Sequence, residues 1–113
     1  MNERQHGMLP TMTSTDHAAA IRFETTPKGG RYFVPMPNGE DSRLTFVKVS
    51  DTHIIADHTF VPVPYRGDGI AEAMVERLVA DARANGWSIT PTCWFVADEI
   101  TRHAPDWDDV LKQ

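Results

Sequence analysis

Residues 58–71 read H-T-F-V-P-V-P-Y-R-G-D-G-I-A, and this stretch decides the fold of the chain. It starts with β-branched and aromatic residues typical of a strand, breaks at two prolines, and ends in a turn that contains Gly67 and Gly69. A helical pattern begins at Ile70. The first N–H groups of a helix have no internal partners and carry about half a positive charge, so a glycine turn in front of them can hold a pyrophosphate. The stretch therefore predicts a strand, a phosphate-binding turn and a helix.

The helix after this turn is the most regular pattern in the chain. Between Ile70 and Ala82 apolar residues recur at a spacing of three and four, and charged residues occupy the other face. Asn85 and Gly86 supply a left-handed stop, and residues 87–90 resume strand character. Strand, helix and strand make a β-α-β unit, whose two strands we expect to be parallel with a right-handed connection.

The residues before this unit predict antiparallel strands. Four segments rich in β-branched and aromatic residues span residues 20–25, 31–35, 44–49 and 53–61. Short turns separate them, and short connections favour antiparallel neighbours. The fold class that we expect is α/β (α+β), an antiparallel N-terminal meander joined to the β-α-β unit.

The end of the chain predicts two short helical elements. Residues 95–103 have roughly helical spacing, and Pro105 cannot continue that helix. Residues 106–111 are expected to form a last helical turn that packs on the sheet.

Composition limits the possible functions. With 113 residues the chain has room for one domain, and we expect a flexible leader at residues 1–17 followed by that domain at 18–113. The net charge of -5 argues against nonspecific nucleic-acid binding, which needs clustered Lys and Arg. Cys93 is the only cysteine, so the chain cannot form an internal disulfide, and its cysteine content does not suggest a cysteine-based zinc site.

From the sequence we expect no targeting signal and no membrane anchor. No apolar run approaches the ~18 residues that span a bilayer, and the first residues lack the apolar core of a signal peptide. We therefore expect a cytoplasmic protein that has no membrane, nucleic-acid or metal partner. The oligomeric state cannot be inferred from the sequence.

Residues 66–71 also fit the pattern R-x-x-G-x-A, the acyl-CoA pyrophosphate motif of the GNAT superfamily of N-acetyltransferases. Two further segments agree with it: H-T-x-V-P at residues 58–62 and C-x-F-V-A at residues 93–97. On these motifs the chain resembles the small single-domain GNAT acetyltransferases. The resemblance covers residues 58–103, and the earlier strands agree only in pattern. Neither the P-loop pattern nor G-x-G-x-x-G occurs in the sequence.

The resemblance implies that acetyl-CoA lies between two splayed strands, here residues 53–61 and 87–92. Backbone groups of one strand would pair with the pantetheine arm like an added strand, and these residues are Thr59, Phe60 and Val61. The backbone of the glycine turn would take the pyrophosphate, and the residues concerned are Arg66, Gly67, Asp68, Gly69, Ile70 and Ala71. The Arg66 side chain is expected to add a contact to a phosphate. The Asp68 carboxylate would repel one, so we expect it to face outward.

Three side chains are candidates for the chemistry. Cys93 lies at the start of a predicted helix, whose field favours a thiolate that could accept the acetyl group; the alternative is a small buried apolar residue. His58 and His103 are candidate general bases, and each has a structural alternative, which for His103 is capping the helix end. At Glu99 the family often has a tyrosine, and at Trp94 often a proline.

The sequence thus predicts an acetyl-CoA-dependent N-acetyltransferase that acts on an unidentified amine acceptor. Transfer could be direct, in a complex of both substrates, or pass through a thioester on Cys93. One alternative is a non-catalytic acyl-CoA-binding module, and another is an interaction domain whose glycine turn binds nothing.

Overall fold

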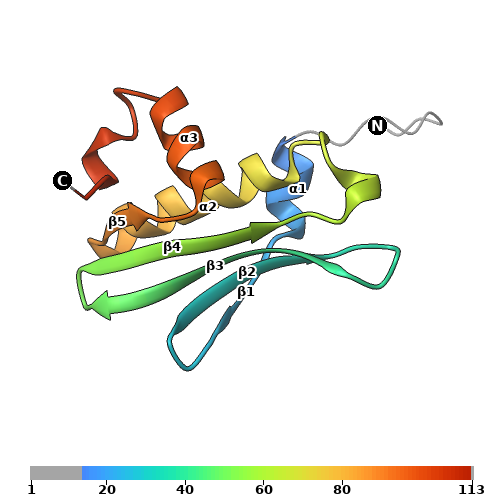
Figure 1. Cartoon of the computed structure of the whole chain (residues 1–113), viewed down its shortest axis with the longest axis horizontal. Coiled ribbons are helices and arrows are strands. Elements are labelled where there is room, and N and C mark those ends of the chain that lie inside the picture. The colour runs from blue at the N-terminus through green and yellow to red at the C-terminus, as the bar shows by residue number, and fades with distance from the viewer. Residues whose placement is uncertain (1–13, 113) are drawn as a thin grey trace, which may run out of the picture.

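A five-stranded sheet with the order β1-β2-β3-β4-β5 forms the centre of the fold, and the computed structural model describes residues 14–112 (Figure 1). The strands are β1 (Arg22–Thr25), β2 (Gly29–Pro35), β3 (Asp41–Ser50), β4 (His53–Phe60) and β5 (Ser88–Pro91). The helices are α1 (Ser14–Ala20), α2 (Ile70–Asn85) and α3 (Trp94–Arg102), with short 3-10 turns η2 (Val63–Tyr65) and η3 (Asp108–Val110). None of these helices is long and apolar enough to cross a membrane.

The strand pairing confirms the predicted topology. Strands β1 to β4 pair antiparallel in chain order, and β4 pairs with β5 in parallel after the crossover through α2. Burial alternates along β2 and along the first half of β3 and β4, so the sheet has one covered face and one more accessible face. The mixed α+β class is therefore confirmed. Strand boundaries differ from the predicted ones by up to three residues, and Ala20, predicted to begin the first strand, instead ends α1.

Helix α2 supplies most of the cover for the buried face. Its apolar stripe is fully enclosed, and the buried residues are Ile70, Ala73, Met74, Val75, Leu78, Val79 and Ala82. On the sheet, the buried Tyr32 donates its hydroxyl to a carboxylate oxygen of Asp81 on α2 at 2.7 Å. Burial, followed by this hydrogen bond, raises the pKa of Tyr32. The helix that carries the glycine turn at its start is thus anchored to the sheet along its whole length.

The first described helix corrects the expected leader at residues 1–17. Residues 14–17 belong to α1, and the His17 side chain is only 2% exposed. The polar composition of this segment concealed the helix, although Ala18, Ala19 and Ala20 are strong helix formers. The rest of the predicted leader, residues 1–13, lies outside the described residues.

Truncating the core of α2 tests this packing. We expect Leu78→Ala to lower the free energy of unfolding by about 2–5 kcal/mol, because it removes a fully buried side chain and leaves a cavity. The exposed Glu76 on the same helix is the control, and Glu76→Ala should change stability by no more than about 0.5 kcal/mol. Urea unfolding of the two variants measures both values; equal losses would contradict the assigned helix face.

Candidate functional site

Strands β4 and β5 part in the middle of the molecule and open a gap in the sheet. Their parallel ladder runs from the pair His53 and Ser88 to the pair Ala56 and Pro91, and it stops there. The Ala56 carbonyl then accepts the N–H of Thr92 at 3.0 Å and the N–H of Cys93 at 3.1 Å. Beyond this point β4 continues as far as Phe60 while the other chain segment turns into α3. The predicted splay is therefore present.

A β-bulge at Asp57 changes the direction of the side chains at the gap. Phe46 pairs with Ala56 while Thr45 pairs with His58, which leaves Asp57 as an extra residue in β4. Its carboxylate accepts a hydrogen bond from the Thr45 hydroxyl at 2.7 Å. An extra residue reverses the alternation of side chains beyond it. Thr59, rather than His58, therefore faces the gap.

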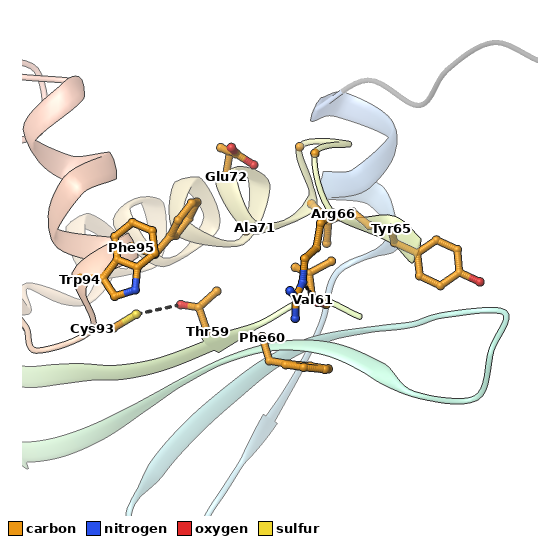
Figure 2. Close-up of a pocket in the computed structure, with 13 residues that line it drawn as sticks. Thr59, Phe60, Val61, Tyr65, Arg66, Ala71, Glu72, Cys93, Trp94 and Phe95 are labelled. Carbon is orange, nitrogen blue, oxygen red and sulfur yellow. Dashed lines mark hydrogen bonds between the residues drawn. The ribbon is translucent and has the colours of Figure 1, made fainter. Parts of the chain in front are cut away.

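A cleft of about 340 Å³ occupies this gap (Figure 2). Its volume is within the range of small-molecule sites. Strand β4, the glycine turn, the start of α2 and the start of α3 all contribute to it, and the lining residues are Thr59, Phe60, Val61, Tyr65, Arg66, Gly67, Gly69, Ile70, Ala71, Glu72, Cys93, Trp94 and Phe95. The cleft thus brings together every residue predicted to contact the cofactor except Asp68.

The glycine turn presents unpaired backbone amides at one end of the cleft. Gly67 and Gly69 have φ of 89° and 91°, in the left-handed region that favours glycine. The first intrahelical bond of α2 runs from the N–H of Ala73 to the carbonyl of Gly69 at 3.0 Å. No backbone carbonyl within residues 14–112 accepts a hydrogen bond from the N–H groups of residues 67–72, and α2 has no side-chain cap. Free amides at a helix start form an anion-binding site.

The two charged residues of the turn take different positions. Arg66 donates from Nε to the carbonyl of Val61 at 2.7 Å, and its guanidinium lies 5.8 Å from the centre of the Phe60 ring. This contact ties the start of the turn to the end of β4. Asp68 is exposed and does not line the cleft, as expected for a carboxylate beside an anion site.

Cys93 lies at the other end of the cleft, at the N-cap of α3. It is half-buried, and its Sγ lies 3.4 Å from the hydroxyl oxygen of Thr59, the contact drawn in Figure 2. Trp94 is 77% exposed at the rim and packs edge-on against Phe95 with ring centres 5.9 Å apart. The sulfur is therefore accessible from the cleft and next to a hydroxyl that can donate to it.

The two histidines proposed as general bases do not reach the cleft. His58 is exposed on the face of β4 opposite Thr59, so the structure does not support it as a general base. His103 ends α3, where its Nδ1 lies 3.0 Å from the carbonyl oxygen of Glu99 and its ring stacks on Trp107 at 3.7 Å. These contacts favour the helix-capping alternative for His103.

Sequence reasoning missed three residues that line the cleft. Tyr65 ends the 3-10 turn η2, Glu72 lies in the first turn of α2, and Phe95 lies in the first turn of α3. For Glu72 and Phe95 the available signal was a position in the first turn of a helix, close to the caps Gly69 and Cys93. Within residues 14–112, no group of three or more His, Cys, Asp and Glu side chains is placed to hold a metal ion.

Comparison with known proteins agrees with this architecture. A family model described as GCN5-related N-acetyl-transferase matches residues 31–110. Among solved structures, the chain is similar to a candidate N-acetyltransferase from Staphylococcus aureus, described as GCN5-like, with a TM-score of 0.57 and 20% identity over 83% of this chain and 90% of that chain. At that identity the likeness shows the fold. No curated protein matched the chain.

The left-handed glycines can be tested by their effect on stability. We expect Gly69→Ala to lower the free energy of unfolding by about 1–2 kcal/mol, because an L-residue is strained at this φ. Gly86→Ala is the matched control with a φ of 72°, and it should cost a similar amount. Neither site is crowded: an added Cβ would meet only His17 at 3.8 Å in the first and nothing within 4 Å in the second. Urea unfolding measures both variants. A lower free energy of unfolding for Gly86→Ala with no change for Gly69→Ala would contradict the conformation of the turn.

Proposed function

Because the chain belongs to the GCN5-related N-acetyltransferase family, we propose that it transfers an acetyl group from acetyl-CoA to the amine of an acceptor. Family membership gives the class of reaction, which is acyl transfer from an acyl-CoA, and makes the protein an enzyme. The acetyl group, the amine acceptor and the chemical route are the parts that we propose. The alternative of a non-catalytic binding module has no particular support in the structure.

One observation carries this proposal: the glycine turn and the start of α2, whose N–H groups make no backbone hydrogen bond, line one end of a cleft that opens between β4 and β5. Phosphate oxygens accept hydrogen bonds from such amides, and the dipole of α2 favours the negative charge. The edge of β4 beyond Ala56 is free of β5, so an extended pantetheine arm can pair with it as an added strand. A ligand that is anionic at one end and extended at the other fits both features.

A cosubstrate whose diphosphate binds at the glycine turn would extend along the cleft toward Cys93, and this supports a role for the Cys93 sulfur. In the route that we favour, the Cys93 thiolate attacks the acetyl carbonyl, the new S–C bond forms, and CoA leaves as a thiolate that takes up a proton. The acceptor amine next attacks this thioester, forms the N–C bond and releases the Cys93 thiolate, while the amine loses a proton to solvent. The Thr59 hydroxyl is placed to donate to the sulfur in its anionic form.

Direct attack by the amine in a complex of both substrates is the competing route. Both routes require the incoming ammonium to lose a proton. His58 and His103 lie outside the cleft, so Glu72, which lines it, or solvent would take that proton. The lining position of the Cys93 sulfur supports the thioester route over the direct one.

Binding of CoA tests the glycine turn. CoA at a hundred times its Kd should stabilise the unchanged protein by about 2.7 kcal/mol in thermal unfolding. We expect Gly69→Ala to weaken binding about tenfold or more in calorimetry, since it disturbs amides that would bind a charged group. Gly86→Ala, which carries the same strain far from the cleft, should bind like the unchanged protein. No stabilisation of the unchanged protein would contradict the proposed function.

Acylation of Cys93 tests the route. After incubation with acetyl-CoA alone, mass spectrometry should find acetyl on Cys93 and none on the Cys93→Ala variant, and adding polyamine, lysine-peptide or aminoglycoside acceptors should discharge it. We expect Cys93→Ala to lose orders of magnitude in rate, as when a nucleophile is removed. Thr59→Val, which keeps the shape of the side chain, should slow acylation while leaving CoA binding intact. Full activity in Cys93→Ala would establish direct transfer instead.

A further inference from the structure

A buried histidine from the N-terminal helix holds the glycine turn by its backbone. His17 on α1 is 2% exposed, and its Nε2 lies 2.7 Å from the carbonyl oxygen of Asp68, which is 51 residues away in sequence. Because a carbonyl can only accept, the ring nitrogen is the donor. The ring also packs against the turn, since an added Cβ on Gly69 would lie 3.8 Å from Cδ2 of His17.

This hydrogen bond sets the direction of the next amide. The peptide bond between Asp68 and Gly69 is trans, so its C=O and its N–H point in opposite directions. With the carbonyl held by His17, the N–H of Gly69 points away from α1. Gly69 lines the cleft, and its N–H has no acceptor among the described residues. The histidine therefore orients an amide that would face an anion bound at this end of the cleft.

The turn needs such a constraint because glycine on either side of Asp68 leaves the peptide planes free to rotate. Gly67 and Gly69 both adopt positive φ, and glycine populates positive and negative φ almost equally. A rotated Asp68–Gly69 peptide would direct its carbonyl oxygen, instead of its N–H, at the anion. Side chains of the turn do not prevent this rotation, since Asp68 is exposed and α2 has no side-chain cap.

We propose that His17 is a positioning residue for the acyl-CoA site, which acts through the Asp68–Gly69 peptide on the diphosphate of the cosubstrate. The inference rests on the proposed function, because it assumes that the turn binds that diphosphate. It extends the site to α1, which lies outside the matched family region of residues 31–110. The role is specific to the diphosphate end of the cleft and leaves Cys93 and Thr59 untouched.

The test compares His17→Gln with His17→Met in the full chain. The two side chains have nearly the same length, but only glutamine carries an N–H donor. We expect His17→Met to raise the Kd of CoA and the KM of acetyl-CoA about tenfold or more with kcat unchanged, and His17→Gln to restore most of the affinity. S-acetylpantetheine, which has the same thioester arm and no diphosphate, should react equally well with both variants and with the unchanged protein.

His53→Met is the matched control for loss of a histidine hydrogen bond. His53 makes an equally short bond, 2.7 Å to the hydroxyl of Thr90, and does not line the cleft. This variant should keep the CoA affinity of the unchanged protein. The role of His17 is refuted, while the proposed function stands, if His17→Met binds CoA as tightly as the unchanged protein. It is also refuted if His17→Met reacts with S-acetylpantetheine as poorly as it reacts with acetyl-CoA. If the unchanged protein fails to bind CoA, the proposed function fails first.

A measurement on the unchanged protein keeps the inference testable if the variants do not fold. In an NMR titration with CoA, the ring Nε2–H proton of His17 and the amide proton of Gly69 should shift together, because one peptide group joins them. S-acetylpantetheine should shift neither. A His17 ring signal that stays in place while the Gly69 amide moves would overturn the proposal.

Discussion

The structure depends on a single backbone oxygen, the carbonyl of Ala56, where the parallel ladder of β4 and β5 ends. This oxygen accepts the N–H groups of Thr92 and Cys93, so the chain leaves the sheet at that residue instead of continuing along β4. Two consequences follow. The far half of β4 keeps an unpaired edge inside the molecule, and Cys93 begins a helix at the point where that edge is exposed. A sheet that paired to its end would have neither the cleft nor an accessible sulfur.

The bulge at Asp57 determines which side chains of β4 face the gap between β4 and β5. It explains why Thr59 lines the cleft while His58, a candidate general base from the sequence, does not. Strict alternation from Ile54 and Ala56 would place His58 on the same face as those buried residues. A bulge is a property of the register between two strands, and the Asp57 contact to Thr45 crosses twelve positions in sequence. Local pattern cannot reveal it.

The sequence predicts the parts of the fold that depend on local patterns, and it does not predict those that depend on contacts between residues far apart in the chain. The helix from Ile70 to Asn85, the antiparallel meander and the parallel β4–β5 pair all follow from periodicity, turn residues and the handedness of crossovers, which are local signals. The glycine turn was found because a motif and its flanking elements agreed. His17 falls in the segment that the sequence predicts as a flexible leader, because the hydrogen bond that fixes it runs to a carbonyl that lies beyond four strands in the chain.

An acidic chain can accommodate an anionic cosubstrate if it uses backbone dipoles instead of cationic side chains. The net charge is -5, and Arg66, the arginine nearest the turn, donates its Nε to a carbonyl of the protein. Backbone amides attract an anion over a shorter range than a charged side chain does. Their contribution to the affinity for the cosubstrate therefore depends on their direction and on how little they reorganise when it binds. A rigid turn then increases the affinity for the cosubstrate more than an additional positive charge would. A turn with glycines at two of three successive positions has little stiffness of its own, and the buried imidazole beneath it supplies what the turn lacks.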